Sequence, residues 1–198
     1  MPIKTASPDS EILDLIKERW SPRAFSSRRP DAETLRRLFE AARWAASSDN
    51  EQPWRYLVAR KEDAEQHERL ASCLFGGNGW ARQAPVLAMS VAARNFARNG
   101  KPNRVALHDT GAASAQLTMQ ATSMGVYVHQ MAGFDTEKAR EVCRIPPDYD
   151  PVAMMAIGYL GDPESLSEPL RTRELSRRER RPAREFVFCT TFGEPATL

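Results

Sequence analysis

Apolar residues recur at intervals of three or four along several stretches of the chain, a spacing that places their side chains on one face of a helix. Ile12, Leu13 and Ile16 have this spacing after Ser10, a residue type that caps helices, which predicts a first helix over residues 10–19. The same pattern predicts further helices, which span residues 31–46, 62–75, 104–124 and 136–143.

Residue types that begin or end helices support these boundaries. Asp31 follows Pro30 and is placed to cap the second helix, as Asp135 is to cap the last one. Gly125 is placed to end the helix over 104–124, which is dense in Gly, Ala, Ser and Thr and therefore lets another helix approach closely. The second helix is expected to point its apolar residues inward, namely Leu35, Leu38, Phe39 and Ala42.

Short apolar runs between these helices predict strands over residues 54–58, 85–92, 127–131 and 152–159. The run over 85–92 is apolar almost throughout, which is typical of a strand buried on both faces and placed centrally in a sheet. Glycines at 76, 77 and 79 predict a mobile loop. Alternating helices and strands indicate an α/β or α+β sandwich with a mixed sheet covered by helices.

The composition changes after Gly161, where arginines become frequent and apolar residues rare. We expect one domain over residues 1–198, in which residues 162–198 form an extended C-terminal arm. Residues 185–188 regain strand character, as though the arm ended by pairing with a sheet edge. The arginines of the arm are Arg171, Arg173, Arg177, Arg178, Arg180, Arg181 and Arg184.

The composition excludes several classes of protein. The 198 residues are 41% hydrophobic with a formal net charge of +2, which is typical of a globular chain and does not require an anionic partner. Cys73, Cys143 and Cys189 are far apart and lack the spacing of a zinc site, so free thiols in the cytoplasm and no bound metal are expected. The longest apolar run, residues 84–93, is too short to cross a bilayer, and we expect no membrane anchor.

Two polar segments carry the candidate chemistry. Arg19 and Arg23 flank Ser21 at the end of the first predicted helix, and guanidinium groups match phosphate oxygens in geometry and charge. The second segment is rich in hydroxyls and amides, which both donate and accept and so suit the edge of a heteroaromatic ring; it contains Ser47, Ser48, Asn50 and Gln52. Together the segments suggest a phosphorylated aromatic cofactor, although each alone also fits a solvated helix end or a turn.

The spacing of these segments resembles the FMN-dependent nitroreductase family. Arg-x-Ser-x-Arg-x-Phe at residues 19–25 and Ala-Ala-Ser-Ser-x-Asn-x-Gln-Pro-Trp at residues 45–54 carry the resemblance. Asp109 opening the small-residue helix, the segment over 130–135 and the strand ending at Gly161 follow in the same order. The resemblance implies an α+β fold with a mainly antiparallel central sheet and a C-terminal arm exchanged within a homodimer.

The resemblance also implies which residues contact FMN. The phosphate side would contain Arg19, Trp20, Ser21 and Arg23, closed by Arg178 and Arg180, with Arg177 or Arg181 as alternatives. The segment formed by Ala46, Ser47, Ser48, Asn50 and Gln52 would reach the flavin from the other subunit. The backbone of Gln130, Met131, Ala132 and Gly133 would face the ring near its reactive nitrogen, although many relatives have Gly or Glu-Gly where this chain has Ala132 and Gly133.

The reaction that the resemblance implies is NADH- or NADPH-dependent reduction of nitroaromatics, quinones or related acceptors in a ping-pong cycle. A flavin transfers hydride without a protein acid or nucleophile, so no catalytic side chain is expected, and His67, His108 and His129 form no catalytic set. Phe75 and Trp80 flank the glycines at 76, 77 and 79 and would border the substrate, while Trp20, Trp44 and Trp54 would pack in the core.

Two alternatives stay open from the sequence. Some relatives with the same fold dehalogenate or desaturate their substrates, and others fragment the flavin itself. The arginine-rich arm could instead bind anions or nucleic acid, but it has few aromatic residues on which bases could stack, so we expect no nucleic-acid partner.

Overall fold

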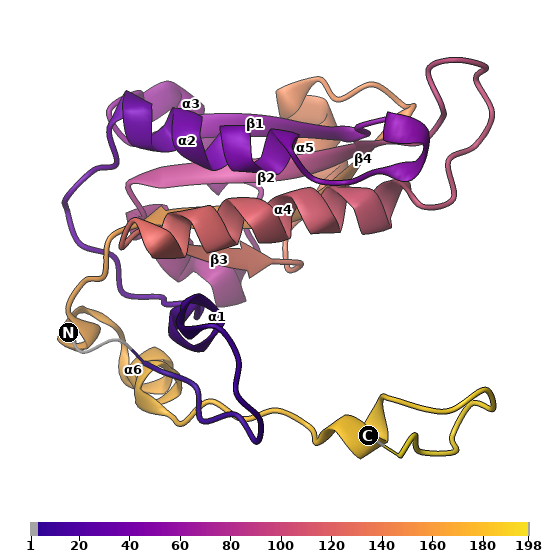
Figure 1. The fold of residues 1–198 in the computed structure, drawn as a ribbon. Coiled ribbons are helices and arrows are strands. Elements are labelled where there is room, and N and C mark those ends of the chain that lie inside the picture. The colour runs from indigo at the N-terminus through magenta and orange to yellow at the C-terminus, as the bar shows by residue number, and fades with distance from the viewer. Residues whose placement is uncertain (1–3, 198) are drawn as a thin grey trace.

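A four-stranded sheet with the strand order β1-β2-β4-β3 forms the centre of the fold (Figure 1). The computed structural model describes residues 4–197. The strands are β1 (Trp54–Arg60), β2 (Val86–Ala93), β3 (Tyr127–Met131) and β4 (Tyr149–Gly158). The prediction of a mainly antiparallel sheet is confirmed, and all pairings between these described strands are antiparallel rather than mixed.

The central position predicted for residues 85–92 is confirmed, because β2 pairs with both β1 and β4 and buries nearly every residue. Successive side chains of a strand point to opposite faces. Val86 and Ala88 accordingly belong to one core cluster, whereas Leu87 and Met89 belong to the other. The sheet therefore separates two apolar layers.

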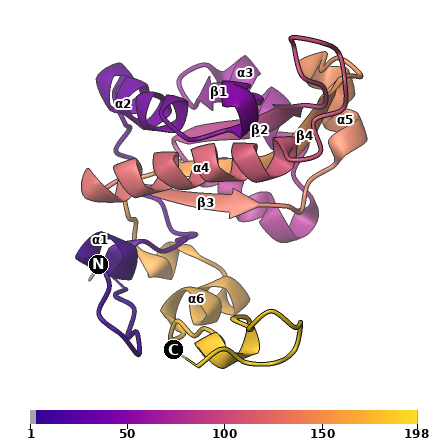
Figure 2. The ribbon, with the colours of Figure 1, turned by 45° about the vertical axis from the view of Figure 1, so that its right-hand side comes forward.

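Helices cover both faces of the sheet (Figures 1 and 2). The helices α2 (Ala32–Arg43) and α4 (Ala106–Ser123) contribute Leu35, Leu38 and Leu117 to the first cluster. The helices α3 (Ala64–Ala71) and α5 (Thr136–Cys143) contribute Leu70 and Ala139 to the second. This arrangement is the helix-flanked sheet that the sequence predicts.

Three predicted helix boundaries are confirmed by the capping contacts. Asp31 accepts a hydrogen bond from the Thr34 amide at 2.7 Å, and Asp135 accepts one from the Lys138 amide at 2.9 Å. Gly125 follows α4 with a φ of +66°, a conformation that glycine adopts without steric cost.

The first predicted helix is wrong in length and in its cap. Only α1 (Asp14–Glu18) is helical, its N-cap residue is Leu13 rather than Ser10, and Leu13 is 71% exposed. The segment before α1 runs back along the helix, because the Ala6 amide donates to the Lys17 carbonyl at 2.9 Å. The chain before α1 therefore lies beside the helix instead of extending it towards Ser10.

Two other expectations are corrected. The glycine-rich segment is not an irregular loop but begins the 3₁₀ helix η2 (Gly76–Gln83). Trp44 does not pack in the core: it is 72% exposed, and its indole N–H donates to the Glu40 carboxylate at 2.9 Å. Trp20 and Trp54 are buried as predicted.

The C-terminal arm leaves the sandwich and lies beside α1, away from the sheet (Figures 1 and 2). It contains the helix α6 (Glu168–Leu175) and the short 3₁₀ helices η3 (Pro163–Ser165) and η4 (Ala183–Glu185). Residues 185–188 join no strand of the sheet within this chain, where Phe188 makes an isolated bridge to Pro195; the predicted pairing of the arm with a partner's sheet stays a prediction. Within residues 4–197, no helix is both long and apolar enough to cross a membrane.

Candidate functional site

The segment between α1 and Phe25, residues 19–24, forms a loop that we call the arginine loop. Its Trp20 is 4% exposed and packs edge-on against Tyr127, with ring centroids 6.3 Å apart. Arg19 donates from Nη1 to the Ser21 hydroxyl at 3.3 Å. The loop is thus fixed by an aromatic anchor, while Arg19 and Ser21 lie together as the sequence predicts.

A cavity of about 700 Å³ opens between the arginine loop and the C-terminal arm. It is lined by Ile12, Ile16, Arg19 and the arm residues Arg177, Arg178, Glu179, Arg180 and Arg181, together with residues 6–9. Burial, and then the positive charge of Arg180, lower the pKa of Arg19 below its usual value. Burial, Arg19 and Arg180 likewise lower the pKa of Arg178.

None of these lining arginines forms a salt bridge within residues 4–197. Like charges held close together raise the free energy of the cationic forms, and an anion placed among them would lower that penalty. Arg178 is bonded to segments far along the chain, since its Nη1 donates to the Lys4 carbonyl at 2.9 Å and to the Lys17 carbonyl at 2.5 Å. Arg19 and Arg180 make local hydrogen bonds, to the Ser21 hydroxyl and the Glu179 carbonyl, and their remaining N–H groups could hold an anion together with Arg177 or Arg181.

Residues 47–52 form a second loop, which we call the amide loop. Three of its residues other than glycine have positive φ, namely Asp49 at 54°, Asn50 at 56° and Gln52 at 52°. This backbone is strained, and such strain persists where surrounding contacts determine the conformation. Inside the loop, the Gln52 side chain donates to the carbonyl and side-chain oxygens of Asn50, both at 3.1 Å, and the Gln52 amide donates to the Ser47 hydroxyl at 3.0 Å.

Asp109 holds the amide loop from the first turn of α4. It is 4% exposed, and its Oδ2 accepts a hydrogen bond from the Ser48 amide at 3.0 Å while its Oδ1 lies 3.0 Å from Nδ1 of His108. On the outer side, Arg98 pairs with Asp49 at 2.7 Å and the Ala97 amide donates to Glu51 at 2.8 Å. The sequence pattern pointed to Asp109 without giving it this role.

The predicted ring-facing segment lies at the end of β3. Gln130 donates to the Thr118 hydroxyl at 3.2 Å, which turns that side chain towards α4. The Gly133 carbonyl accepts from Asn78 at 2.9 Å and from the Phe75 amide at 3.4 Å. A Cβ atom at Gly133 would come within 2.7 Å of the Asn78 side-chain nitrogen, so a larger residue would require the Asn78 side chain to move.

His129 joins the arginine loop to β3, a link that no sequence motif indicated. Its Nδ1 lies 2.9 Å from the Pro22 carbonyl, and since a carbonyl only accepts, the imidazole donates. Its ring centroid lies 4.7 Å from that of Trp80, which also stacks on Phe25 at 6.4 Å. Burial, followed by the charge of Arg23 among smaller causes, lowers the pKa of His129 to about 4. His129 is therefore neutral at ordinary pH.

One chain does not bring all the predicted site residues together. The amide loop is bonded to the first turn of α4, whereas the arginine loop packs on Tyr127, just beyond the other end of α4. Figure 1 shows these places at opposite ends of that helix. The arginine loop, His129 and the arm arginines form one group, and the amide loop forms a separate one.

Comparisons with known proteins decide the family. The sequence profile described as the nitroreductase family matches residues 16–77 and 63–159 of this chain. The chain belongs to the nitroreductase family. This confirms the resemblance found in the sequence and makes the chain an oxidoreductase.

Three similar proteins illustrate the breadth of the match. A crystal structure described as an oxidoreductase containing FMN superimposes with a TM-score of 0.90 at 32% identity, covering 98% of this chain and 99% of that one. An uncharacterized 15.4 kDa protein of Mycolicibacterium smegmatis is 34% identical over 71% of this chain and 99% of its own length. A protein of Archaeoglobus fulgidus, provisionally named NADH dehydrogenase/NAD(P)H nitroreductase, is 24% identical over 80% of this chain and 90% of its own length.

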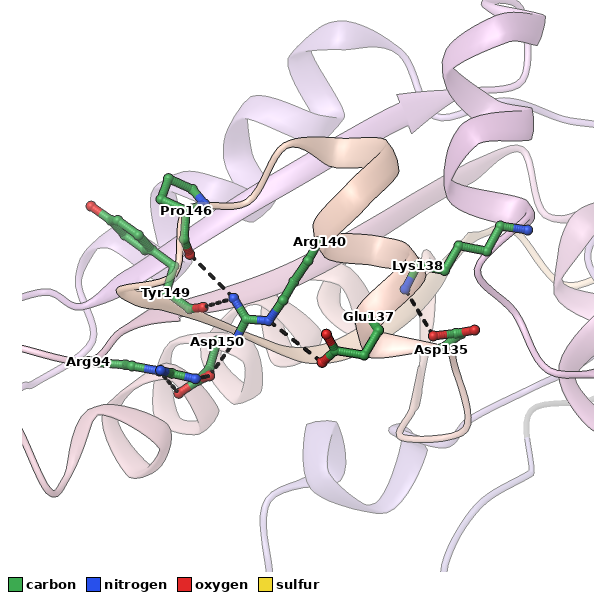
Figure 3. A network of polar contacts seen from close by, with 8 residues as sticks. All are labelled: Arg94, Asp135, Glu137, Lys138, Arg140, Pro146, Tyr149 and Asp150. Carbon is green, nitrogen blue, oxygen red and sulfur yellow. Dashed lines mark hydrogen bonds and ion pairs between the residues drawn. The ribbon is translucent and has the colours of Figure 1, made fainter.

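A polar network joins the end of β2 to the start of β4 in the nitroreductase sheet (Figure 3). Arg140 of α5 donates to Asp150 at 2.8 Å and to the Tyr149 carbonyl at 2.6 Å, while Arg94 donates to the other carboxylate oxygen of Asp150 at 2.9 Å. The hydrogen bond from Arg94 is the main reason why the pKa of Asp150 lies below its usual value. The network ties α5 to β4 and to the end of β2, where the segment that contacts the amide loop begins.

Proposed function

We propose that this chain is an FMN-dependent oxidoreductase that uses NADH or NADPH to reduce nitroaromatics, quinones or related electron-poor acceptors. The observation that carries the proposal is the group of guanidinium side chains around the cavity beside the arginine loop, which lacks a carboxylate partner within residues 4–197 and so fits a phosphate group. The FMN named for the similar crystal structure supports the choice of cofactor.

The chain's residues would divide the binding of FMN between them. Arg19, Ser21, Arg23 and Arg180 would hold the phosphate, and Arg178 would support them through its bonds to the Lys4 and Lys17 carbonyls. Backbone amide groups over residues 130–133 would lie along the ring, where fixed donors stabilise negative charge. When bound, FMN would supply the hydride chemistry, and we infer no catalytic side chain.

The separation of the amide loop from the arginine loop supports a homodimer. Since one chain holds these loops at opposite ends of α4, a second copy would have to bring its amide loop, with Ala46, Ser47, Ser48, Asn50 and Gln52, to the flavin. Within the arm over 162–198, the end over residues 185–198 would exchange between the copies, while α6 would keep its contacts to the arginine loop of its own chain. We further infer a single domain per chain, a cytoplasmic location and a ping-pong cycle in which the nicotinamide leaves before the acceptor binds.

The first experiment is a visible absorption spectrum of the purified protein, followed by addition of NADH or NADPH without oxygen. We expect flavin bands that bleach. A folded protein that is colourless and takes up no added FMN would overturn the assignment of the cofactor. Bands that persist after both nucleotides would favour another flavin reaction, such as dehalogenation, desaturation or flavin fragmentation.

Steady-state kinetics then test the acceptor and the order of binding. With the nucleotide and a quinone or nitroaromatic varied together, a ping-pong cycle gives parallel lines in double-reciprocal plots. Intersecting lines would contradict the proposed order. Bleaching by the nucleotide without turnover of either acceptor class would contradict the proposed substrates while leaving the cofactor in place.

A further inference from the structure

Glu174 is a charged side chain with no exposed surface, and it lies in α6 of the C-terminal arm. Its two carboxylate oxygens accept hydrogen bonds from the Arg23 amide at 3.0 and 2.9 Å, and one of them accepts from the Ala24 amide at 3.1 Å. Nη1 of Arg23 lies 3.8 Å from Oε2 of Glu174. A residue 151 positions along the chain therefore holds the backbone of the arginine loop.

The backbone of Glu174 is held as well. Its carbonyl accepts a hydrogen bond from Nζ of Lys4 at 2.7 Å, and the Lys4 carbonyl in turn accepts from Arg178 at 2.9 Å. These contacts join the segment before α1, the arginine loop and the end of α6 into one unit. The position of Glu174 relative to the loop is thus fixed from several directions.

Burying a carboxylate costs free energy unless its oxygens are hydrogen-bonded, and here both oxygens are. A negative charge close to a phosphate site also opposes the binding of an anion. The electrostatic effect of Glu174 on phosphate binding is therefore unfavourable, whereas its geometric effect is to fix the loop that carries Arg19, Ser21 and Arg23. These two effects predict opposite results when the charge is removed.

We propose that Glu174 is a positioning residue, which fixes the arginine loop so that its side chains meet the phosphate of the cofactor. This inference rests on the proposed function. It predicts that Glu174 contributes to the affinity for FMN and not to the affinity for riboflavin, which has the same ring system without the phosphate.

The test compares both ligands in the full-length protein carrying Glu174→Gln, which keeps the size of the side chain but removes its charge and replaces one acceptor oxygen by an NH2 group that cannot accept from the Arg23 amide. We expect the dissociation constant for FMN to rise about 10- to 100-fold, the range that corresponds to a hydrogen bond to a charged group. The dissociation constant for riboflavin should change less than about twofold by the same reasoning, since no contact to the ring is altered.

Glu179→Gln is the matched control, because it removes the same charge from an exposed residue of the arm, beside the cavity that Arg19 lines, without touching the arginine-loop backbone. It should leave the FMN to riboflavin ratio unchanged or shift it slightly in favour of FMN. Circular dichroism and thermal unfolding would establish that the variants fold. If Glu174→Gln does not fold, Glu174→Asp is measured by the same ratio, and it should give a smaller loss of the preference for FMN.

The outcomes separate cleanly. An unchanged ratio, or equal weakening of both ligands, would overturn the positioning role, and tighter binding of FMN would show that the charge of Glu174 only repels the phosphate. A wild-type protein that binds neither ligand would overturn the proposed function itself, and this inference with it.

Discussion

The arginine loop and the amide loop are each held by a buried carboxylate that accepts backbone N–H groups, but the carboxylates come from different places. Asp109 belongs to α4, which packs in the first core cluster, whereas Glu174 belongs to an arm outside the sandwich. The amide loop is strained and polar, and the arginine loop is relaxed and cationic. The amide loop is therefore characterised by its strained backbone conformation, and the arginine loop by its positive charge.

The largest expected effect comes from removing charge at the arginine loop. Arg19→Ala should weaken FMN binding by about 100-fold or more, because a guanidinium that meets a phosphate makes charge-assisted hydrogen bonds. Riboflavin binding should barely change. Arg37→Ala, an exposed arginine of α2, is the control. Equal losses for the two ligands would mean that Arg19 is not a phosphate contact.

The next effect distinguishes the second loop. Asp109→Asn should lower the free energy of unfolding by about 1–3 kcal/mol, because the buried side chain keeps one acceptor oxygen for the Ser48 amide and His108 in place of two charged ones. FMN and riboflavin should be weakened by the same factor, since this loop would read the ring. Urea denaturation and ligand titration give the two numbers. If Asp109→Asn weakened the binding of FMN but not of riboflavin, the proposed difference between the two loops would be contradicted.

Acid should act on the arginine loop through His129. Its pKa is about 4 in the folded protein and about 6.5 in an unfolded chain. Between these values the unfolded state binds a proton that the folded state does not, so stability falls as the pH decreases from about 6.5 to about 4 and this contribution is constant below that. The free energy of unfolding of His129→Gln should depend less steeply on pH over this range. Parallel curves for the two proteins would refute the role of His129.

The smallest effect concerns strain in the amide loop. Asp49→Gly should stabilise the protein by up to about 1 kcal/mol, because glycine adopts a positive φ without steric cost. The substitution also removes the exposed ion pair to Arg98, and Arg98→Ala measures that loss separately. If Asp49→Gly is less stable than Arg98→Ala, the positive φ of residue 49 carries no penalty.

Local chemistry explains why much of the fold could be predicted. Asp31, Asp135 and Gly125 act within a few residues of their own positions, and the apolar run of β2 specifies a buried strand by itself. The first helix was misjudged because the chain before Asp14 folds back to Lys17, which the spacing of its apolar residues does not show. Trp44 was misjudged because a helix end can turn a tryptophan outward when a carboxylate accepts its N–H, as Glu40 does.

The candidate site was only partly accessible from the sequence for a related reason. Arg19, Ser21 and Arg23 form a recognisable local pattern, of which the structure brings Arg19 and Ser21 into contact while Arg23 lines a different cavity. Glu174 and His129 act on that pattern from far along the chain, and nothing in their local sequence distinguishes a buried acceptor from a solvated acid. For the same reason the sequence could not rank the arm arginines. In the structure Arg178 is bonded to the Lys4 and Lys17 carbonyls, whereas Arg180 is bonded to the neighbouring Glu179 carbonyl.

The bond between Glu174 and the arginine loop also has a consequence for synthesis. A ribosome releases the arginine loop early and α6 late, so a nascent chain completes its sheet before the loop gains its anchor. The proposed phosphate site would then be completed only after α6 has been synthesised. Neither apolar layer contains a residue of α6, so the order of synthesis separates the sandwich from the anchor of its proposed anion pocket.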